Sequence, residues 1–114
     1  MASKSDHKRL RQLAVLAELA AQRTAADLHT KKAVETQLDE RLIAIDHPSQ
    51  TSEDSRVRFT ASGAAKLWHI WQVKERRRLG ILAARARLAA DAARRAHARA
   101  EARRRVLEKI CKPK

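Results

Sequence analysis

The side chains able to do acid–base or metal chemistry are few and scattered in this sequence. The five histidines lack the i, i+4 spacing of a helical metal site, and the single cysteine, Cys111, has no second cysteine for a disulfide or a zinc site. Asp39 and Glu40 are adjacent, so on a helix they do not face each other as a catalytic pair would. No phosphate-binding glycine loop or nucleophile elbow occurs. The sequence therefore predicts no catalytic, cofactor-binding or metal-binding residue, and a protein that is not an enzyme.

Guanidinium groups are abundant instead. Residues 76–105 hold eleven arginines and only two acidic residues, Asp91 and Glu101. Two triplets lie at the ends of this stretch: Arg76, Arg77 and Arg78, then Arg103, Arg104 and Arg105. Such a face can neutralise nucleic-acid phosphates, bind the carboxylates of an acidic protein surface, or remain solvated without a partner. The stretch lacks aromatic residues that would stack on bases, which weakens the case for single-stranded nucleic acid.

The aromatic residues gather in one place. Leu67, Trp68, Ile70 and Trp71 lie within about one helical turn of each other, in a chain whose aromatic content is only 3%. Trp68 is expected to pack on Leu42 and Ile45 of an earlier helix and to anchor the pair. Ile70 and Trp71 would then remain available to a partner. The predicted partner-binding residues are Leu42, Trp68, Ile70, Trp71, Arg76, Arg77, Arg78, Arg103, Arg104 and Arg105.

Composition indicates which elements must position these side chains. The chain has 114 residues and a formal net charge of +13, with two glycines and two prolines. Its hydrophobic content of 44% includes 23 alanines, which bury little area each, so a compact globular core would be poorly filled. Abundant Ala, Leu, Arg, Lys and Glu is typical of long helices and coiled coils, and argues against most enzymes.

Two long helices are predicted, at about residues 5–46 and 62–110. Pro48 and the aperiodic stretch PSQTSEDSRVRF predict a loop at about 47–61, with Thr60 or Ser62 capping the second helix. Helices of this length cannot be buried in a domain of this size, so they should pair along their length. The sequence predicts an all-α fold: one domain, residues 1–114, formed by two long helices in an antiparallel coiled-coil hairpin.

Each helix carries a predicted apolar seam. In the first helix, steps of three and four residues select Leu10, Leu13, Ala17, Ala20, Thr24, Leu28, Leu38, Leu42 and Ile45. In the second, they select Trp68, Leu79, Leu82, Ala86, Ala89, Ala93, Ala96, Ala100, Leu107 and Ile110. The polar N-terminus and the short, interrupted apolar stretch that follows lack the pattern of a signal peptide or a membrane span. We therefore expect a soluble cytoplasmic protein with a reduced cysteine.

A family resemblance rests mainly on the second helix. The stretch AAKLWHIWQVKERRRLGILAARARLAADAARRAHARAEARRRVLEKI resembles the C-terminal helix of FliJ-like flagellar export proteins of α-proteobacteria. It similarly combines a tryptophan-containing turn, a basic Arg-Arg step, an alanine-rich middle and a closing run of Ala, Arg and Leu. The first helix is similar only in being amphipathic and ending before a proline-containing turn. The chain departs from the family in being shorter, and in having His97-Ala98-Arg99 where a Phe-Gly-Arg step is expected.

The resemblance implies a coiled-coil stalk at the cytoplasmic face of the flagellar basal body. Its implied partners are the type III export ATPase ring, the cytoplasmic domain of the export gate, and export chaperones. By analogy, residues 1–9 and the region around 103–114 would face the ATPase, and the part with Leu42, Trp68 and Trp71 would face the gate. Two other interpretations stay open: a basic helical protein that binds nucleic acid nonspecifically through residues 76–105, and a dimer in which two hairpins form a four-helix bundle.

Overall fold

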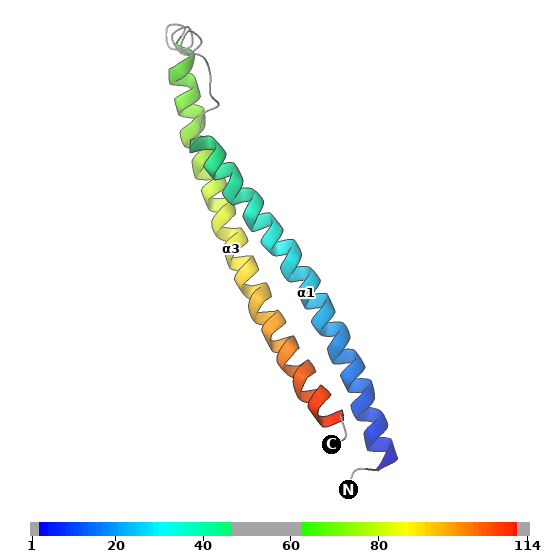
Figure 1. The fold of residues 1–114 in the computed structure, drawn as a ribbon. Coiled ribbons are helices and arrows are strands. Elements are labelled where there is room, and N and C mark those ends of the chain that lie inside the picture. Colours follow the sequence, from blue (N-terminus) through cyan, green and yellow to red (C-terminus); the bar gives the residue numbers. More distant parts are fainter. Residues whose placement is uncertain (1–2, 47–62, 112–114) are drawn as a thin grey trace. The chain divides into compact units, whose positions relative to one another are not determined.

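The structure, a computed structural model, describes residues 3–46 and 63–111 (Figure 1). Helix α1 spans Lys4–Asp46 and helix α3 spans Ala64–Cys111, and these described ranges contain no strand. The predicted all-α fold with two long helices is confirmed, and each predicted helix end differs by at most two residues from the observed one. The predicted loop at 47–61, with the caps Thr60 and Ser62, lies outside the described residues. No helix in the described part of the chain has the length and apolar character needed to cross a bilayer.

Both described helix starts have a local cause in the sequence. Before α1, the Ser3 hydroxyl accepts a hydrogen bond from the Asp6 N–H at 3.1 Å, and the Ser3 N–H donates to the Asp6 carboxylate at 3.2 Å. This reciprocal pair satisfies two N–H groups that have no partner inside the helix. Before α3, Gly63 has a φ of 77°, a left-handed conformation that glycine adopts without a Cβ penalty.

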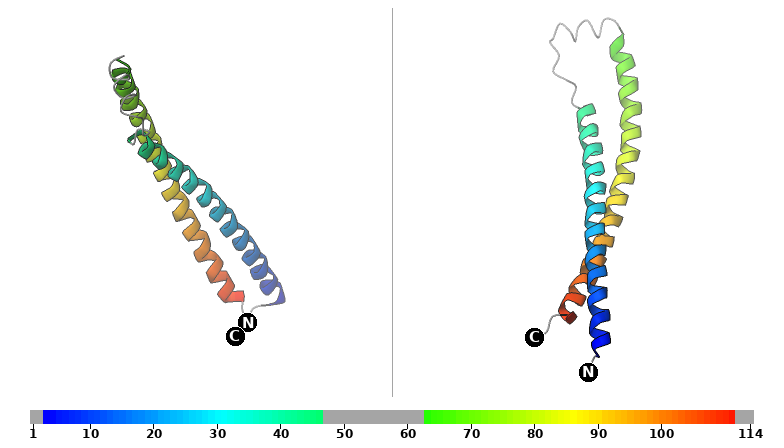
Figure 2. Two further views of the ribbon diagram at one scale, coloured as in Figure 1. Left: turned by 45° about the horizontal axis from the view of Figure 1, so that its top comes forward. Right: turned by 90° about the vertical axis from the view of Figure 1, so that its right-hand side faces the viewer.

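The chain forms two compact units, and each contains a segment of both helices. In unit 1 (Met1–Ala33 with Leu88–Lys114), Thr24 meets His97, and Glu18 meets Arg104. In unit 2 (Val34–Arg87), Ile45 meets Gln72 and Asp39 meets Arg87. In each unit, residue numbers fall along α1 as they rise along α3, so the two segments are antiparallel, as the views in Figure 2 also show.

Alanine fills the interface of unit 1. The buried residues are Ala21 from α1 and Ala90, Ala93 and Ala100 from α3, and Ala90 is fully buried at 0% exposure. Small side chains let the two helix backbones approach closely, but each buries little apolar area. The close approach explains why no large side chain is fully buried among the described residues of this unit.

The predicted seam of α1 is off by one residue near the N-terminus. Leu13 and Ala20 are exposed, and the neighbouring Ala14 and Ala21 take their places. The buried and half-buried positions Leu10, Ala14, Ala17, Ala21, Thr24 and Leu28 follow alternating steps of four and three. Because α3 presents alanines here, a narrow seam forms that accepts alanine from α1 and leaves leucine outside.

The seam of α3 shows a similar shift. Leu79, Ala86, Ala93 and Ala100 are buried as predicted. Between them, Ala83 and Ala90 are fully packed, while the predicted Leu82, Ala89 and Ala96 are only half-buried at the edge of the seam. At the two ends of the seam, Trp68 is 37% exposed and Ile110 55%, so neither is buried, and Cys111 is half-buried beside Ile110. The series Ala83, Ala90 and His97 therefore takes the place of the predicted series Leu82, Ala89 and Ala96. The other predicted series, from Leu79 to Ala100, stays in the seam.

Gly80 offers a direct test of helix propensity in α3. A Cβ added there would meet no atom within 4 Å, and its φ is not in the left-handed region. We expect Gly80→Ala to raise the free energy of unfolding by up to about 1 kcal/mol, because alanine loses less backbone entropy in a helix. Urea unfolding followed by far-UV circular dichroism would measure it. Gly63→Ala is the matched control and should destabilise, because its φ of 77° strains any L residue.

Candidate functional site

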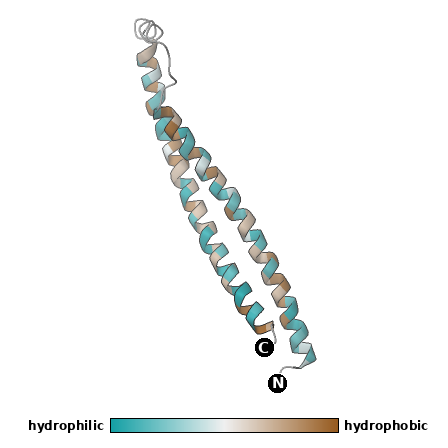
Figure 3. Cartoon of the chain, viewed as in Figure 1, coloured by the Kyte–Doolittle hydropathy of each residue, from teal (hydrophilic) through white to brown (hydrophobic). Residues whose placement is uncertain are grey.

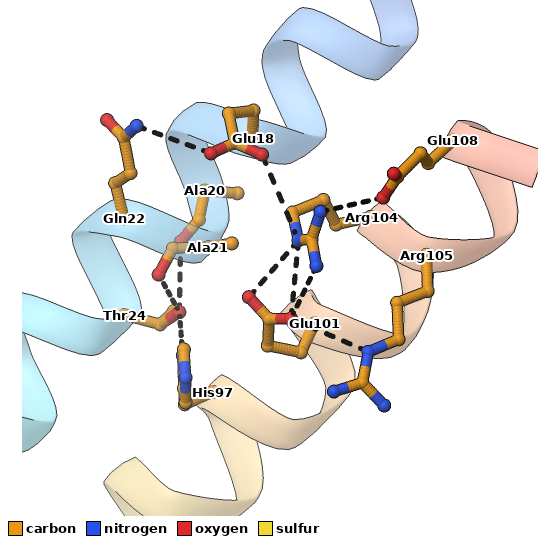
Figure 4. Close-up of polar contacts among 10 residues, drawn as sticks. All are labelled: Glu18, Ala20, Ala21, Gln22, Thr24, His97, Glu101, Arg104, Arg105 and Glu108. Carbon is orange, nitrogen blue, oxygen red and sulfur yellow. Dashed lines mark hydrogen bonds and ion pairs between the residues drawn. The ribbon is translucent and has the colours of Figure 1, made fainter. Parts of the chain in front are cut away.

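One interhelical hydrogen bond interrupts the alanine interface of unit 1. The Thr24 hydroxyl of α1 lies 3.0 Å from Nδ1 of His97 in α3 (Figure 4). The same hydroxyl lies 3.0 Å from the carbonyl oxygens of Ala20 and Ala21, to which it can donate. Alanine seams specify register weakly because adjacent registers bury similar areas, whereas a polar pair is satisfied in only one of them. Thr24 and His97 thus fix the register of unit 1.

Arg104 is the centre of an ion-pair cluster in the same unit. Its guanidinium lies 3.1 Å from Glu101 and 2.9 Å from Glu108 on its own helix, and 3.8 Å from Glu18 of α1. Its hydrogen bonds to Glu101 lower the pKa of that carboxyl and raise the pKa of the guanidinium. Arg105 also reaches Glu101, at 3.8 Å. In the second triplet, Arg104 and Arg105 therefore bind carboxylates of their own chain.

The lowered pKa of Glu101 makes a contribution to stability that depends on pH. A carboxyl whose pKa is lower in the folded state stabilises the fold above its unfolded-state pKa, and loses that contribution as pH falls through the folded-state pKa. We expect Glu101→Gln to destabilise the protein at neutral pH, and the difference from wild type to shrink toward zero in acid. Urea unfolding of both proteins at a series of pH values measures this; a difference that stays constant down to strongly acid pH would contradict it.

Three arginines of unit 2 are engaged in a similar way. Arg76 pairs with Asp46, and Arg87 pairs with Asp39 at 3.1 Å, so both link α3 to α1. Arg78 pairs with Glu75 within α3, and this hydrogen bond lowers the pKa of the Glu75 carboxyl. These pairs are largely exposed, so solvent screens them and each contributes little to stability. Arg76 and Arg78 are therefore not unpaired cations, and a partner could bind them only by displacing these carboxylates.

Five arginines of the basic stretch have no carboxylate partner among the described residues. Arg94 pairs with Asp91, and the unpaired five are Arg77, Arg85, Arg95, Arg99 and Arg103. In unit 1, Arg95, Arg99 and Arg103 recur every four residues and so lie in a row on one face of α3. The arginine surface predicted from sequence is thus reduced to about half of its members.

The predicted aromatic cluster is exposed in unit 2. Leu67 is 70% exposed, Trp71 52%, Ile70 45% and Trp68 37%, while Leu42 of α1 is half-buried. The Gln72 side chain donates to the Ile45 carbonyl at 2.8 Å, which places this contact one turn after Trp68 in α3. The packing of Trp68 on Leu42 and Ile45 stays a prediction.

A mixed apolar and basic surface continues from Ile70 along α3. Five of its residues line a shallow hollow and are called here the α3 face: Ile70, Val73, Lys74, Arg77 and Ile81. The three apolar members are 43–50% exposed, and neither cation has a carboxylate partner among the described residues. Such a row, without an acidic residue of its own, exposes apolar area and positive charge side by side.

Several exposed apolar residues and one polar pair were not among the residues predicted from sequence. Figure 3 shows hydrophobic and hydrophilic stretches alternating along both α1 and α3. The predicted partner-binding residues did not include Val73 and Ile81 of α3. They also did not include Val15, Leu16 and Leu19 of α1, which are 54–61% exposed. A second apolar row beside the seam was the available signal for these residues. The pairing of Thr24 with His97 could have been found from two polar residues at core positions of the two heptads.

Comparisons with known proteins assign no class to this surface. Among residues 3–46 and 63–111, no three His, Cys, Asp or Glu side chains are grouped as a metal site would require. No protein-family model, curated protein or solved structure matches the chain. The fold and the α3 face therefore carry the functional argument.

Proposed function

We propose that this protein is a non-enzymatic, protein-binding helical hairpin that docks on its partner through the α3 face and the neighbouring Trp71. The single observation that carries the proposal is the exposure of Ile70, Trp71 and Ile81 on one helix of unit 2. Exposed aromatic and aliphatic side chains in a contiguous patch are characteristic of binding surfaces, since burying them on a partner is favourable.

The charge of the α3 face supports an acidic protein partner. Lys74 and Arg77 lie among the apolar residues, and neither has a carboxylate partner in the part of the chain that the structure describes. Arginine can bind carboxylates in a bidentate manner, and complementary charge raises both the association rate and the specificity. The paired Arg76 and Arg78 contribute less, because a partner would first have to displace Asp46 and Glu75.

For the biological setting, we propose a cytoplasmic accessory of a flagellar or type III protein-export apparatus. This assignment is supported by the resemblance of α3 to FliJ-like export proteins. Paired helices with an exposed apolar and basic surface on α3 suit contact with the export ATPase, the cytoplasmic domain of the export gate, or export chaperones. In this proposal the α3 face meets the gate.

Direct binding tests this proposal. The full chain would be titrated into the purified export ATPase and the purified gate domain of its own organism, and affinity measured by calorimetry at about 300 mM salt, where exposed charge attraction is strongly screened. Saturable binding to either protein supports the proposal. Absence of binding to both would refute the assignment of the α3 face to the gate and of the protein to the ATPase, while leaving the exposed α3 face to be tested against export chaperones and other proteins.

Nonspecific nucleic-acid binding is the second candidate, because Arg95, Arg99 and Arg103 form an unpaired cationic row in unit 1. If each contacts one phosphate of duplex DNA, replacing all three by glutamine should reduce the slope of log affinity against log salt by about 2.7. Filter binding over a salt series would measure this slope. An unchanged slope would exclude these arginines as phosphate ligands.

A further inference from the structure

Helix α1 exposes its own apolar patch in unit 1, on a different helix from the α3 face. Val15, Leu16 and Leu19 are 60%, 61% and 54% exposed. Together with Gln12 they are named here the α1 patch; Gln12, Val15 and Leu16 line a shallow hollow with Lys8 and Arg11. Three large aliphatic side chains within two turns expose far more apolar surface than isolated surface leucines do.

The α1 patch cannot be covered by α3 within unit 1. Its helix already faces α3 with Ala14, Ala17 and Ala21, which are half-buried or buried. At about 100° per residue, Val15, Leu16 and Leu19 lie on the opposite side of the helix from those alanines. Their spacing of i, i+1 and i+4 forms a ridge that fits the groove of another helix.

Positive charge borders the α1 patch. Lys8, Arg11 and Arg23 have no carboxylate partner among the described residues. The nearby carboxylate of Glu18 is already engaged, since it accepts from Gln22 at 3.4 Å and lies 3.8 Å from Arg104. A partner that covers the patch would therefore meet several unneutralised cations and few anions.

This charge distribution argues against a second copy of the chain as the occupant. Two α1 patches facing each other would bring Lys8, Arg11 and Arg23 against the same three cations, in either a parallel or an antiparallel arrangement. The net charge of +13 adds general repulsion between copies. A partner helix with leucines along one stripe could pack on the ridge of Val15, Leu16 and Leu19. Asp or Glu residues beside that stripe could pair with the cations.

We propose that the α1 patch, with Lys8, Arg11 and Arg23, is a docking surface for an acidic amphipathic helix of a partner protein. This surface is separate from the α3 face, so the proposal does not depend on the export setting. The protein would then have two docking surfaces, one in each unit.

The probe is a fluorescein-labelled synthetic helix of about three heptads, with leucine at core positions and glutamate at the flanking positions. The full chain is titrated with it at about 150 mM salt, and fluorescence anisotropy gives the affinity. We expect Leu16→Gln with Leu19→Gln to weaken binding by about 30-fold or more, as expected for removing central apolar anchors. A peptide with lysine in place of glutamate should not bind.

The matched control is Leu88→Gln with Val106→Gln. These two residues of α3 are 70% and 56% exposed in the same unit, so the control removes similar apolar surface elsewhere. It should change affinity less than about 2-fold, as should Ile70→Gln with Trp71→Ala in unit 2. Glutamine is a good helix former, so all variants should keep the wild-type helix content, which circular dichroism checks.

Three results would overturn the proposal. Equal weakening by the Leu16/Leu19 variant and the Leu88/Val106 control would show generic attraction between an acidic peptide and a basic protein. A dimer in sedimentation equilibrium that the Leu16/Leu19 variant abolishes would make a second copy the occupant. Binding of wild type, but not of that variant, to phosphatidylserine-containing vesicles, with no peptide binding, would make a lipid surface the occupant.

Discussion

Replacing Ala90 by leucine is expected to lower the free energy of unfolding by about 2 to 3 kcal/mol, a large effect for a substitution of one apolar residue by a larger one. Ala90 is the most completely buried residue described, at 0% exposure, and lies between Ala86 and Ala93 in the seam of α3. A leucine there would force the helix backbones of unit 1 apart. The neighbouring alanines would then lose the close contacts that make their small area stabilising.

Ala92→Leu is the matched control for this prediction. Ala92 lies two residues along the same helix and is exposed, and leucine and alanine have similar helix propensities. Urea unfolding of the two variants and the wild type, followed by circular dichroism, separates the effect of packing on the free energy of unfolding from the effect of helix propensity. If both leucine variants unfold at the wild-type midpoint, the interface of unit 1 is looser than a close-packed alanine seam.

Sequence patterning predicted the fold class and the helix bounds for reasons that lie in local chemistry. A chain with two glycines, two prolines and 23 alanines contains little that would end a helix before Pro48. The apolar periodicity of Leu38, Leu42 and Ile45 also located the inward face of α1 in unit 2, where all three residues are half-buried. In these positions large side chains mark the inward face clearly.

Register in unit 1 was not predictable from apolarity alone. Leu13 and Ala14 are both apolar, and the more hydrophobic of the two was expected to point inward, yet Leu13 is 50% exposed. The choice depends on the partner helix: an alanine-lined α3 segment favours the smallest side chains across from it. That dependence on two helices at once cannot be read from the periodicity of one. The polar contact between Thr24 and His97 then fixes the choice.

The exposure of the apolar cluster was predicted more successfully than the pairing of the arginines. Ile70 and Trp71 were predicted to be available to a partner, and both are exposed. The arginine triplets were treated as uniform, but Arg76, Arg78 and Arg104 bind carboxylates of the chain, while Arg77 and Arg103 have no carboxylate partner within residues 3–46 and 63–111. Pairing between i and i+3, as in Arg78 with Glu75, is visible in sequence; the contact of Arg76 with Asp46 requires the fold.

Combining Ile70→Gln with Trp71→Ala is expected to weaken binding of the protein partner at the α3 face by at least about 30-fold, because aromatic and aliphatic anchors supply most of the energy of such interfaces. Calorimetric titration of the purified gate domain with wild type and variant measures the ratio of affinities. Both residues are about half exposed, so unfolding midpoints should stay close to wild type.

Leu88→Gln provides the control for that loss, since Leu88 is 70% exposed on α3 but belongs to unit 1. Its affinity for the gate domain should match that of wild type. A further variant, Arg77→Gln, separates charge from apolar contact: it should slow association and reduce the salt dependence, with a smaller loss of affinity than the Ile70/Trp71 variant. If Arg77→Gln abolishes binding while the Ile70/Trp71 variant binds normally, the partner recognises the cations of unit 2 alone, and the apolar residues of the α3 face have no part in docking.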